Sequence, residues 1–298
     1  MSKSLLGELQ EAVAGAAETV GPSVVGLGRG WGRGSGVVIG DGQVLTCAHV
    51  LRGDEVAVTF GDGRTEAGSV AGADADLDLA VISVDTGDAP AVAWEPERVG
   101  ALGLGSPVLA LADPSGRGLR VTFGLVSATS RSFRGPGGRR IGGSIEHSAP
   151  LPRGSSGGPL VDLEGHLLGL NAVRREGGLI LAVPADEAVR TRVAALARGE
   201  ATGRPRLGVA LASSRHARRM RLAVGLPERD GLLVRGIVPG SPADRAGLQR
   251  GDLLVSAGGR RLSSVDDLFD ALDAAGNGSL ALGVVRGSDE RDVDVALG

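Results

Sequence analysis

The chain has 298 residues, of which 42% are apolar, and its formal net charge is −3. This length and apolar content are sufficient for two domains with packed cores. The small net charge gives no reason to expect nucleic acid as a partner, and the single cysteine excludes an internal disulfide. No apolar stretch reaches the roughly 18 residues that a membrane-spanning helix needs.

The first 22 residues predict an amphipathic helix. Their apolar residues recur at helical spacing, at Leu5, Leu6, Leu9, Val13 and Ala16. Glutamates interrupt this stretch where the apolar region of a signal peptide would lie. We therefore expect an N-terminal helical segment over 1–22 and a protein located in the cytoplasm.

Residues 23–197 and 206–298 differ in pattern and predict two domains. Short β-branched runs broken by glycine-rich turns fill the first range, which is typical of an antiparallel sandwich or barrel. A helical pattern over 185–196 closes this domain, and 198–205 form a polar linker with glycine and proline. The second range mixes strand and helix patterns and has the size of a separate α+β module.

The segment 154–160 reads Gly-Ser-Ser-Gly-Gly-Pro-Leu and contains a serine flanked by glycines. A tight bend of this kind exposes the Ser156 hydroxyl and turns consecutive backbone N–H groups toward the atom that it attacks. Clusters of glycine and serine are more often plain loops. A catalytic interpretation therefore needs a general base and an orienting carboxylate elsewhere in the chain.

His49 is the candidate base. It lies in the segment 44–50, directly after a strand pattern, where Thr-Cys-Ala-His resembles the histidine motif of chymotrypsin-like serine proteases. The remaining histidines are expected to be solvated or hydrogen-bonded surface residues; they are His147, His166 and His216.

Asp78 is the candidate carboxylate because it directly adjoins the strand pattern of 79–84. That position would hold its side chain rigidly beside an imidazole, and Asp-Leu-Ala-Val resembles the aspartate motif of the same proteases. Asp76 is the second choice, and the nearby Asp74 is expected to be a solvated loop residue.

The three candidates follow one another in the order His49, Asp78 and Ser156. The α/β hydrolases share the Gly-x-Ser-x-Gly pattern, but their serine precedes the acid and the histidine, and a helix follows it. Residues 159–170 read instead as a strand, a turn and a second strand. Both the order and the pattern exclude an α/β hydrolase.

Several motifs together resemble the HtrA (Deg) family of serine proteases. In the first domain these are 34–39, 46–50, 78–81, 154–160 and 181–184. In the second domain, 240–243, 246–248 and 251–252 resemble the PDZ domain that follows the protease in this family. The resemblance spans nearly the whole chain, with the motifs in the family's order.

The resemblance implies a mainly β fold, a chymotrypsin-like double β-barrel followed by an α+β PDZ domain. It implies a serine endopeptidase that degrades unfolded or misfolded proteins without a cofactor or a metal. Ser156 would attack the scissile carbonyl, His49 would take and return its proton, and Asp78 would orient His49. The backbone N–H groups of Gly154 and Ser156 would hold the oxyanion.

The S1 pocket implied by the resemblance comes from segments around 150–152, 171–173 and 179–181. Because these segments contain no carboxylate, we expect cleavage after small or medium aliphatic residues rather than after lysine or arginine. The expected pocket residues are Pro150, Leu151, Ala172, Leu179 and Leu181.

The PDZ resemblance implies binding of peptide C-termini by strand addition. The expected binding residues are Leu207, Gly208, Val209, Val265 and Phe269. Relatives commonly form trimers, so a homotrimer is expected from the resemblance alone. The alternative function is a protease fold resting in an inactive state that acts as a chaperone or peptide-binding module.

The chain departs from the family pattern at a few positions near the site. Ser155 stands where the family usually has asparagine, Cys47 replaces an asparagine before the histidine, and Ser148 stands where aspartate is common. None of these changes removes a member of the triad, so they affect its tuning rather than its chemistry.

Overall fold

The computed structural model describes residues 4–28, 34–114, 116–136, 138–200 and 205–297. The chain divides into two compact units, Met1–Thr202 and Gly203–Gly298. The linker expected over 198–205 spans this division, and its residues 201–204 lie outside the described residues. No helix within the described residues has the length and apolarity that crossing a membrane requires.

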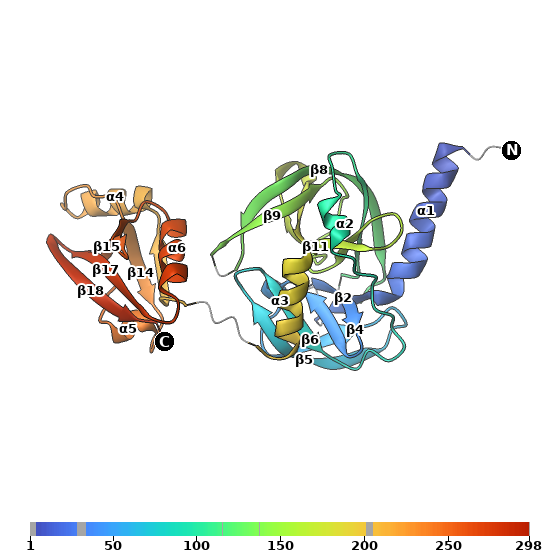
Figure 1. Cartoon of the computed structure of the whole chain (residues 1–298), viewed down its shortest axis with the longest axis horizontal. Helices are drawn as coiled ribbons and strands as arrows, with labels where there is room; N and C mark the ends of the chain where they lie inside the picture. The colour runs from blue at the N-terminus through green and yellow to red at the C-terminus, as the bar shows by residue number, and fades with distance from the viewer. Residues whose placement is uncertain (1–3, 29–33, 115, 137, 201–204, 298) are drawn as a thin grey trace. The chain divides into compact units, whose positions relative to one another are not determined.

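In the described residues, the first unit contains two closed β-barrels of six strands each (Figure 1). The first barrel has the strand order β1-β2-β3-β6-β5-β4, with every neighbouring pair antiparallel. Its strands are β1 (Val24–Leu27), β2 (Gly34–Gly40), β3 (Gln43–Thr46), β4 (Glu55–Thr59), β5 (Thr65–Asp74) and β6 (Leu79–Ser83).

The second barrel has the order β10-β11-β12-β9-β8-β7 and is also antiparallel throughout. Its strands are β7 (Pro107–Ala112), β8 (Arg120–Arg134), β9 (Arg140–His147), β10 (Pro159–Val161), β11 (Leu167–Arg174) and β12 (Ile180–Pro184). One hydrophobic cluster continues from the first barrel into the second, with Leu45 and Val81 on one side and Leu111 and Leu170 on the other. The chymotrypsin-like fold class predicted from the motifs is confirmed.

Three helices of the first unit lie outside the barrels in its described part: α1 (Leu5–Val20), α2 (Glu97–Gly100) and α3 (Glu187–Ala197). Helix α1 begins after Ser4, whose hydroxyl accepts a hydrogen bond from the Gly7 N–H. Its C-terminal turns pack on the barrels through Ala16 and Val20, whereas Leu6 is 76% exposed near the end that extends away (Figure 1).

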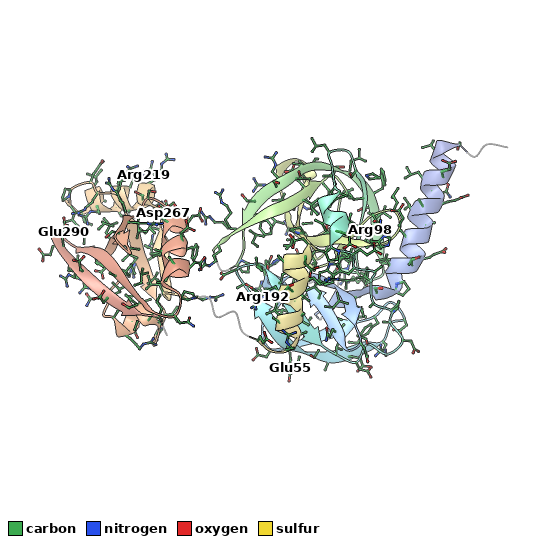
Figure 2. The ribbon with its side chains drawn as sticks, viewed as in Figure 1. Glu55, Arg98, Arg192, Arg219, Asp267 and Glu290 are labelled. Carbon is green, nitrogen blue, oxygen red and sulfur yellow. The ribbon has the colours of Figure 1, made fainter. Side chains whose placement is uncertain are left out.

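Helix α3 packs against β5 and β6 of the first barrel. The Asp186 side chain caps its N-terminus by accepting a hydrogen bond from the Val189 N–H. Arg192, which Figure 2 labels on this helix, places its Nε 2.8 Å from the Oδ2 of Asp74. This pair fastens the helix to the end of β5.

A buried ion pair joins the tip of the β8–β9 hairpin to the loop that precedes β6. The Arg139 Nε lies 3.1 Å from the Asp76 Oδ2, and both side chains are buried. Gly135 belongs to the same contact, because a Cβ there would lie 3.0 Å from the Ala75 carbonyl oxygen. Breaking a buried ion pair by removing one partner typically costs about 3–5 kcal/mol. The contact thus holds a loop of the first barrel against a hairpin of the second.

The second unit is a sheet of order β13-β14-β15-β17-β18, with β16 paired to β15. Ser264 and Asp267 form a capping box at the start of helix α6. Hydrogen bonds from Ser263 and Ser264 lower the pKa of Asp267 to about 2. The elements are β13 (Val209–Ala212), α4 (Ser214–Ala223), β14 (Leu232–Ile237), α5 (Pro242–Arg245), β15 (Leu253–Ala257), β16 (Arg260–Arg261), α6 (Val265–Ala275), β17 (Ser279–Arg286) and β18 (Asp289–Ala296).

Candidate active site

His49 and Asp78 lie together in the first barrel. His49 belongs to the short 3₁₀ helix η2 (Ala48–Val50), directly after β3. Its Nδ1 lies 2.7 Å from the Asp78 Oδ2, and its backbone N–H donates to the Asp78 Oδ1 at 2.9 Å. Because an ionised carboxylate only accepts, it holds the Nδ1–H tautomer and leaves Nε2 as the acceptor. That is the state of a general base.

The backbone of Asp78 is held in a rarely populated conformation. Its φ of +56° is left-handed, which typically costs about 1–2 kcal/mol for a residue with a Cβ. The Ala48 N–H donates to the Asp78 carbonyl oxygen at 3.1 Å and helps to hold this shape. The second-choice carboxylate, Asp76, instead pairs with Arg139. The structure therefore brings Asp78 to His49 and gives Asp76 a different partner.

The loop that carries Ser156 belongs to the second barrel and docks on the first. The Ser35 N–H of β2 donates to the Ser156 carbonyl oxygen at 2.9 Å, and the Ser35 hydroxyl donates to the Gly154 carbonyl oxygen at 3.1 Å. Gly157 has a φ of +86°, and a Cβ there would lie only 2.2 Å from the Thr46 Oγ1. Only glycine fits this contact.

The Ser156 hydroxyl donates to the Ala172 carbonyl oxygen of β11 at 3.1 Å. Within the described residues it makes no hydrogen bond to His49, so a rotation about its χ1 would have to precede proton transfer. The N–H groups of Gly154 and Ser156 have no protein acceptor among the described residues.

Asn171 of β11 holds the loop that carries Ser156. Its side-chain Nδ2 donates to the carbonyl oxygens of Gly158 and Pro159, and its backbone carbonyl accepts from the Gly157 N–H at 2.8 Å. The Asn171 Oδ1 is then an acceptor for the His147 Nε2, 2.9 Å away. His147 therefore carries its proton on Nε2, and within the described residues its Nδ1 has no partner.

His147 is fully buried, so the expectation of a surface histidine is wrong. Its motif gave no signal because burial arises from the pairing of β9 with β8 and β12, which sequence spacing does not reveal. Burial disfavours the charged form and lowers the pKa of His147 to about 4, against the hydrogen bond with Asn171.

Cys47 precedes the 3₁₀ helix η2 and is also fully buried. Its thiol lies 3.6 Å from the Asn171 carbonyl oxygen. Burial, and next to it the charge of Asp78, raise the pKa of this thiol well above its ordinary value. A thiol kept protonated is a poor nucleophile.

Among the residues that the structure describes, two groups of side chains have donor atoms close enough for a metal ion. The donors of Cys47, His49 and Asp78 form one group, but both carboxylate oxygens already accept from His49. The second group is Asp162, Glu164 and His166.

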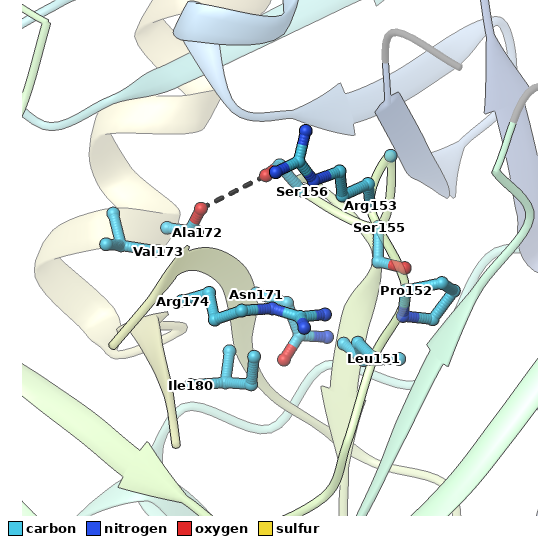
Figure 3. A pocket seen from close by; sticks show the side chains of 11 residues that line it. Leu151, Pro152, Arg153, Ser155, Ser156, Asn171, Ala172, Val173, Arg174 and Ile180 are labelled. Atoms are coloured by element: carbon cyan, nitrogen blue, oxygen red, sulfur yellow. Dashed lines mark hydrogen bonds between the residues drawn. The ribbon is translucent and has the colours of Figure 1, made fainter. Parts of the chain in front are cut away.

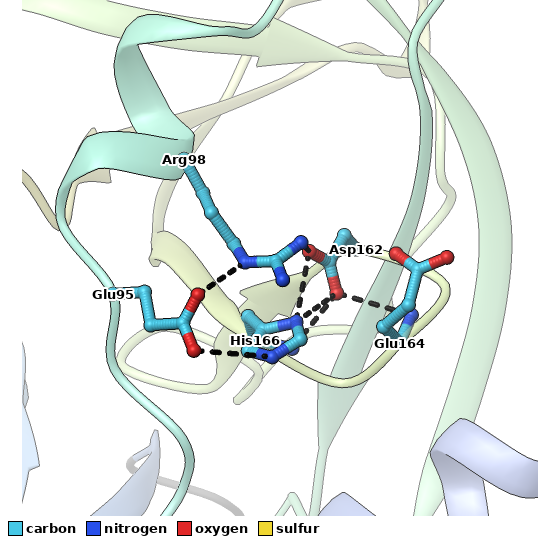
Figure 4. Close-up of polar contacts among 5 residues, drawn as sticks. All are labelled: Glu95, Arg98, Asp162, Glu164 and His166. Atoms are coloured by element: carbon cyan, nitrogen blue, oxygen red, sulfur yellow. Dashed lines mark hydrogen bonds and ion pairs between the residues drawn. The ribbon is translucent and has the colours of Figure 1, made fainter.

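An arginine, Arg98, lies beside the second group (Figure 4). The Arg98 Nε lies 2.7 Å from the Glu95 Oε2, and its Nη1 lies 3.1 Å from the Asp162 Oδ2. His166 places its Nδ1 3.1 Å from both Asp162 oxygens. Asp162 and Glu95 thus share a cationic partner from the protein, and the cluster ties α2 to the β10–β11 turn.

A pocket of about 410 Å³ opens beside Ser156 (Figure 3). Of the expected S1 residues, Leu151 and Ala172 line it, whereas Pro150, Leu179 and Leu181 do not. Side chains alternate along an extended chain, so Ile180 faces the pocket while Leu181 points into the core. Pro150 is exposed next to the buried Leu151.

The sequence interpretation missed two charged residues of the same pocket. Arg153 and Arg174 line it, together with Pro152, Val173 and Asn171. Arg153 directly follows the expected pocket segment 150–152, and Arg174 directly follows the segment 171–173. Nothing in the spacing of the sequence indicates that either side chain faces the pocket.

The expected peptide-binding residues of the second unit lie on β13, on the turn before it and on α6. Leu207 is buried in the core, and Gly208 has a φ of +80°, where a Cβ would lie 2.2 Å from that of Ser241. Val209 begins β13, an edge strand of the sheet. Val265 and Phe269 are half-buried one turn apart on α6, while Leu268 and Leu272 are core residues.

The buried neutral His147 predicts a pH-dependent stability. In the unfolded chain, the His147 imidazole binds a proton below its ordinary pKa of 6.5. In the folded chain it binds this proton only below about pH 4. The free energy of unfolding should therefore fall as the pH is lowered through this window, by about 3 kcal/mol in total. Urea denaturation between pH 7 and pH 4.5 should show a shallower loss for His147→Gln than for the wild type.

The matched control is His216→Gln, because His216 is an exposed histidine of α4. This variant should follow the wild-type curve. Equal pH dependence of the wild type and His147→Gln would contradict the assignment of a neutral buried imidazole.

Comparison with known proteins agrees with this architecture. Residues 34–170 match the model of the trypsin-like peptidase domain, and residues 233–286 match that of the PDZ domain. The structure resembles that of the HtrA-type protease AlgW with a decapeptide, with a TM-score of 0.63 over 96% of this chain and 98% of that one. At 24% sequence identity, this likeness concerns the fold.

Two curated relatives resemble the chain in sequence. HhoA of Synechocystis sp., named as a serine protease, is 36% identical over 86% of this chain and 68% of its own length. A DegP-like periplasmic serine endoprotease of Hahella chejuensis is 34% identical over 89% of this chain. The chain spans 56% of the length of that relative.

The expectation of a cytoplasmic location is wrong. The names of several relatives place those proteins in the periplasm or the chloroplast. The expectation rested on glutamates near the N-terminus, which carry no information about how the relatives are transported.

The domain matches and the identity to HhoA together show that the chain belongs to the HtrA (Deg) family of serine proteases.

Proposed function

We propose that this chain hydrolyses peptide bonds of unfolded proteins with His49, Asp78 and Ser156 as its catalytic triad. The observation that carries the proposal is the 2.7 Å contact between His49 and the buried carboxylate of Asp78, next to the docked Ser156 loop. The carboxylate stabilises the imidazolium that forms when His49 takes the Ser156 proton.

The oxyanion of the tetrahedral intermediate needs donors that are free before the substrate arrives. The unpaired N–H groups of Gly154 and Ser156 in the described structure support this role. Losing one such donor typically costs about a hundredfold or more in rate. The glycine at 154, with a φ of +87°, permits the bend that presents these groups.

The substrate proposal rests on the pocket beside Ser156. Leu151 and Ile180 form an apolar base, which suits the small or medium aliphatic residues expected from the sequence. Such residues are buried in folded proteins and become accessible in unfolded ones.

The alternative function is a resting fold that binds peptides without cleaving them. The hydrogen bond from the Ser156 hydroxyl to the Ala172 carbonyl oxygen is the observation that favours it. This is a single hydrogen bond, and rotation about the Ser156 χ1 breaks it. A substrate that displaces it would allow the hydroxyl to turn toward His49. The homotrimer expected from the resemblance stays a prediction.

Covalent labelling separates the two functions. A fluorophosphonate should label the wild-type chain, and casein should be degraded in parallel, because both need an activated serine. Ser156→Ala should lose both signals, and His49→Ala should reduce both at least a thousandfold.

Ser155→Ala is the matched control, because the Ser155 hydroxyl is buried without a hydrogen-bond partner in the described residues. It should keep labelling and cleavage. Labelling that persists in Ser156→Ala would overturn the assignment of the nucleophile, and binding of casein without labelling or cleavage would favour the alternative.

For the second unit we propose that a peptide C-terminus adds as a strand to the edge of β13. Gly208 and its left-handed φ precede that edge, and Val265 and Phe269 offer partly exposed apolar surface on α6. In the full-length Ser156→Ala variant, a labelled peptide with an apolar C-terminal residue should bind more tightly than its C-terminal amide.

Val265→Glu should weaken this binding at least tenfold, because it places a charged group on the partly exposed apolar surface that the peptide would cover. Asp270→Asn, at an exposed position of α6, should leave it unchanged. Equal binding of the free and amidated peptides, measured by fluorescence anisotropy, would contradict C-terminal recognition.

A further inference from the structure

Two guanidinium groups line the pocket beside Ser156, and none of the described residues that line it carries a carboxylate. Arg153 directly precedes Gly154, and Arg174 ends β11 two residues after Ala172. Figure 3 shows Arg174 reaching from β11 toward the space between Ile180 and Leu151. The nucleophile and both cations therefore share one cavity.

Neither arginine has a partner among the described residues. Within the described residues, Arg153 and Arg174 make no hydrogen bond and no ion pair, although both are placed to line the pocket. Other arginines of this unit, such as Arg98 and Arg192, contact carboxylates at 2.7–3.1 Å. Thus no described residue pairs with the positive charge of the pocket.

The base of the pocket complements an aliphatic stem. Leu151, Val173 and Ile180 supply apolar surface, and the Nδ2 of Asn171 is already engaged with two backbone carbonyls. A side chain that enters would place its methylene groups on this base and its end group near the guanidinium of Arg174, while Arg153 adds positive charge on the side of Ser156. Guanidinium groups bind carboxylates through paired, charge-assisted hydrogen bonds.

We propose that Arg153 and Arg174 are specificity-determining residues that make this pocket accept an acidic side chain, foremost glutamate, at the residue whose carbonyl Ser156 attacks. The inference rests on the proposed function and extends it. The apolar base still admits aliphatic residues, while the cations favour glutamate over its neutral isostere glutamine. They also disfavour lysine, because like charges would meet in one cavity.

The comparison of glutamate with glutamine isolates charge from shape. The substrates are quenched fluorescent peptides, blocked at both ends and without other acidic residues. They differ only in the residue before the scissile bond, which is Glu, Gln, Val or Lys. For the wild type, kcat/KM should be roughly tenfold higher for Glu than for Gln at low salt. Because the guanidiniums are exposed to solvent, this ratio should shrink at 0.5 M salt, and Lys should be cleaved slowest.

Arg153→Met and Arg174→Met remove one cation each while keeping an unbranched stem. Each should lower the Glu/Gln ratio severalfold, and the double variant should bring it near one. Arg175→Met is the matched control, because Arg175 is exposed, adjoins Arg174 and does not line the pocket. It should keep the wild-type ratio.

A phosphonate probe with the same Glu and Gln pair measures the pocket without turnover, through the rate of Ser156 labelling. A wild-type Glu/Gln ratio of one or less, with the Val peptide cleaved or its phosphonate bound to Ser156, would overturn this inference and leave the proposed function intact. A ratio that both arginine variants leave unchanged would overturn it as well. No cleavage of any peptide and no labelling of Ser156 would contradict the proposed function itself, and this inference with it.

Discussion

The candidate site depends on one close contact, in which the loop that carries Ser156 docks from the second barrel onto β2 and β3 of the first. Gly157 makes this contact possible, because any side chain there would overlap the Thr46 hydroxyl and the Ser35 carbonyl oxygen. The Ser35 N–H then fixes the Ser156 carbonyl oxygen. His49 follows β3 directly, so the same docking determines where His49 and Ser156 can meet. Each barrel supplies part of the site, and neither holds it alone.

A second layer of polar contacts supports that docking from β11. Asn171 binds the carbonyl oxygens behind the loop, and it can accept from His147 only while that imidazole donates through Nε2. The Ala172 carbonyl of this strand accepts from the Ser156 hydroxyl, and Arg174 of the same strand lines the pocket beside Ser156. One strand therefore positions the loop, the resting hydroxyl and the charge of the pocket.

Much of this arrangement could be predicted from sequence, because it is encoded in short local patterns. Three local patterns predicted the candidate residues: the glycines around Ser156, the strand that ends before His49 and the strand that begins after Asp78. The structure brings His49 and Asp78 into contact. The two-domain motifs likewise predicted the fold class. These patterns are local because a tight bend and a strand end each need only a few neighbouring residues.

The remaining features depend on contacts between distant segments. Burial of His147 follows from the closure of the second barrel, and the pairing of Asp76 follows from a hairpin that carries Arg139. The resting direction of the Ser156 hydroxyl is set by a β11 carbonyl, and the presence of Arg174 in the pocket by the course of the same strand. No spacing rule contains this information, because each feature joins residues that only the folded chain brings together.

The central claim is that Ser156, docked between the barrels, becomes the nucleophile when its hydroxyl leaves the Ala172 carbonyl for His49. A crystal structure of the phosphonate-inhibited protein tests this most directly. The account predicts a covalent bond from the Ser156 Oγ to phosphorus, the His49 Nε2 within hydrogen-bond distance, and a phosphonate oxygen facing the N–H groups of Gly154 and Ser156. An adduct on another residue, or an adduct on Ser156 with both N–H groups turned away from the phosphonate oxygens, would contradict it.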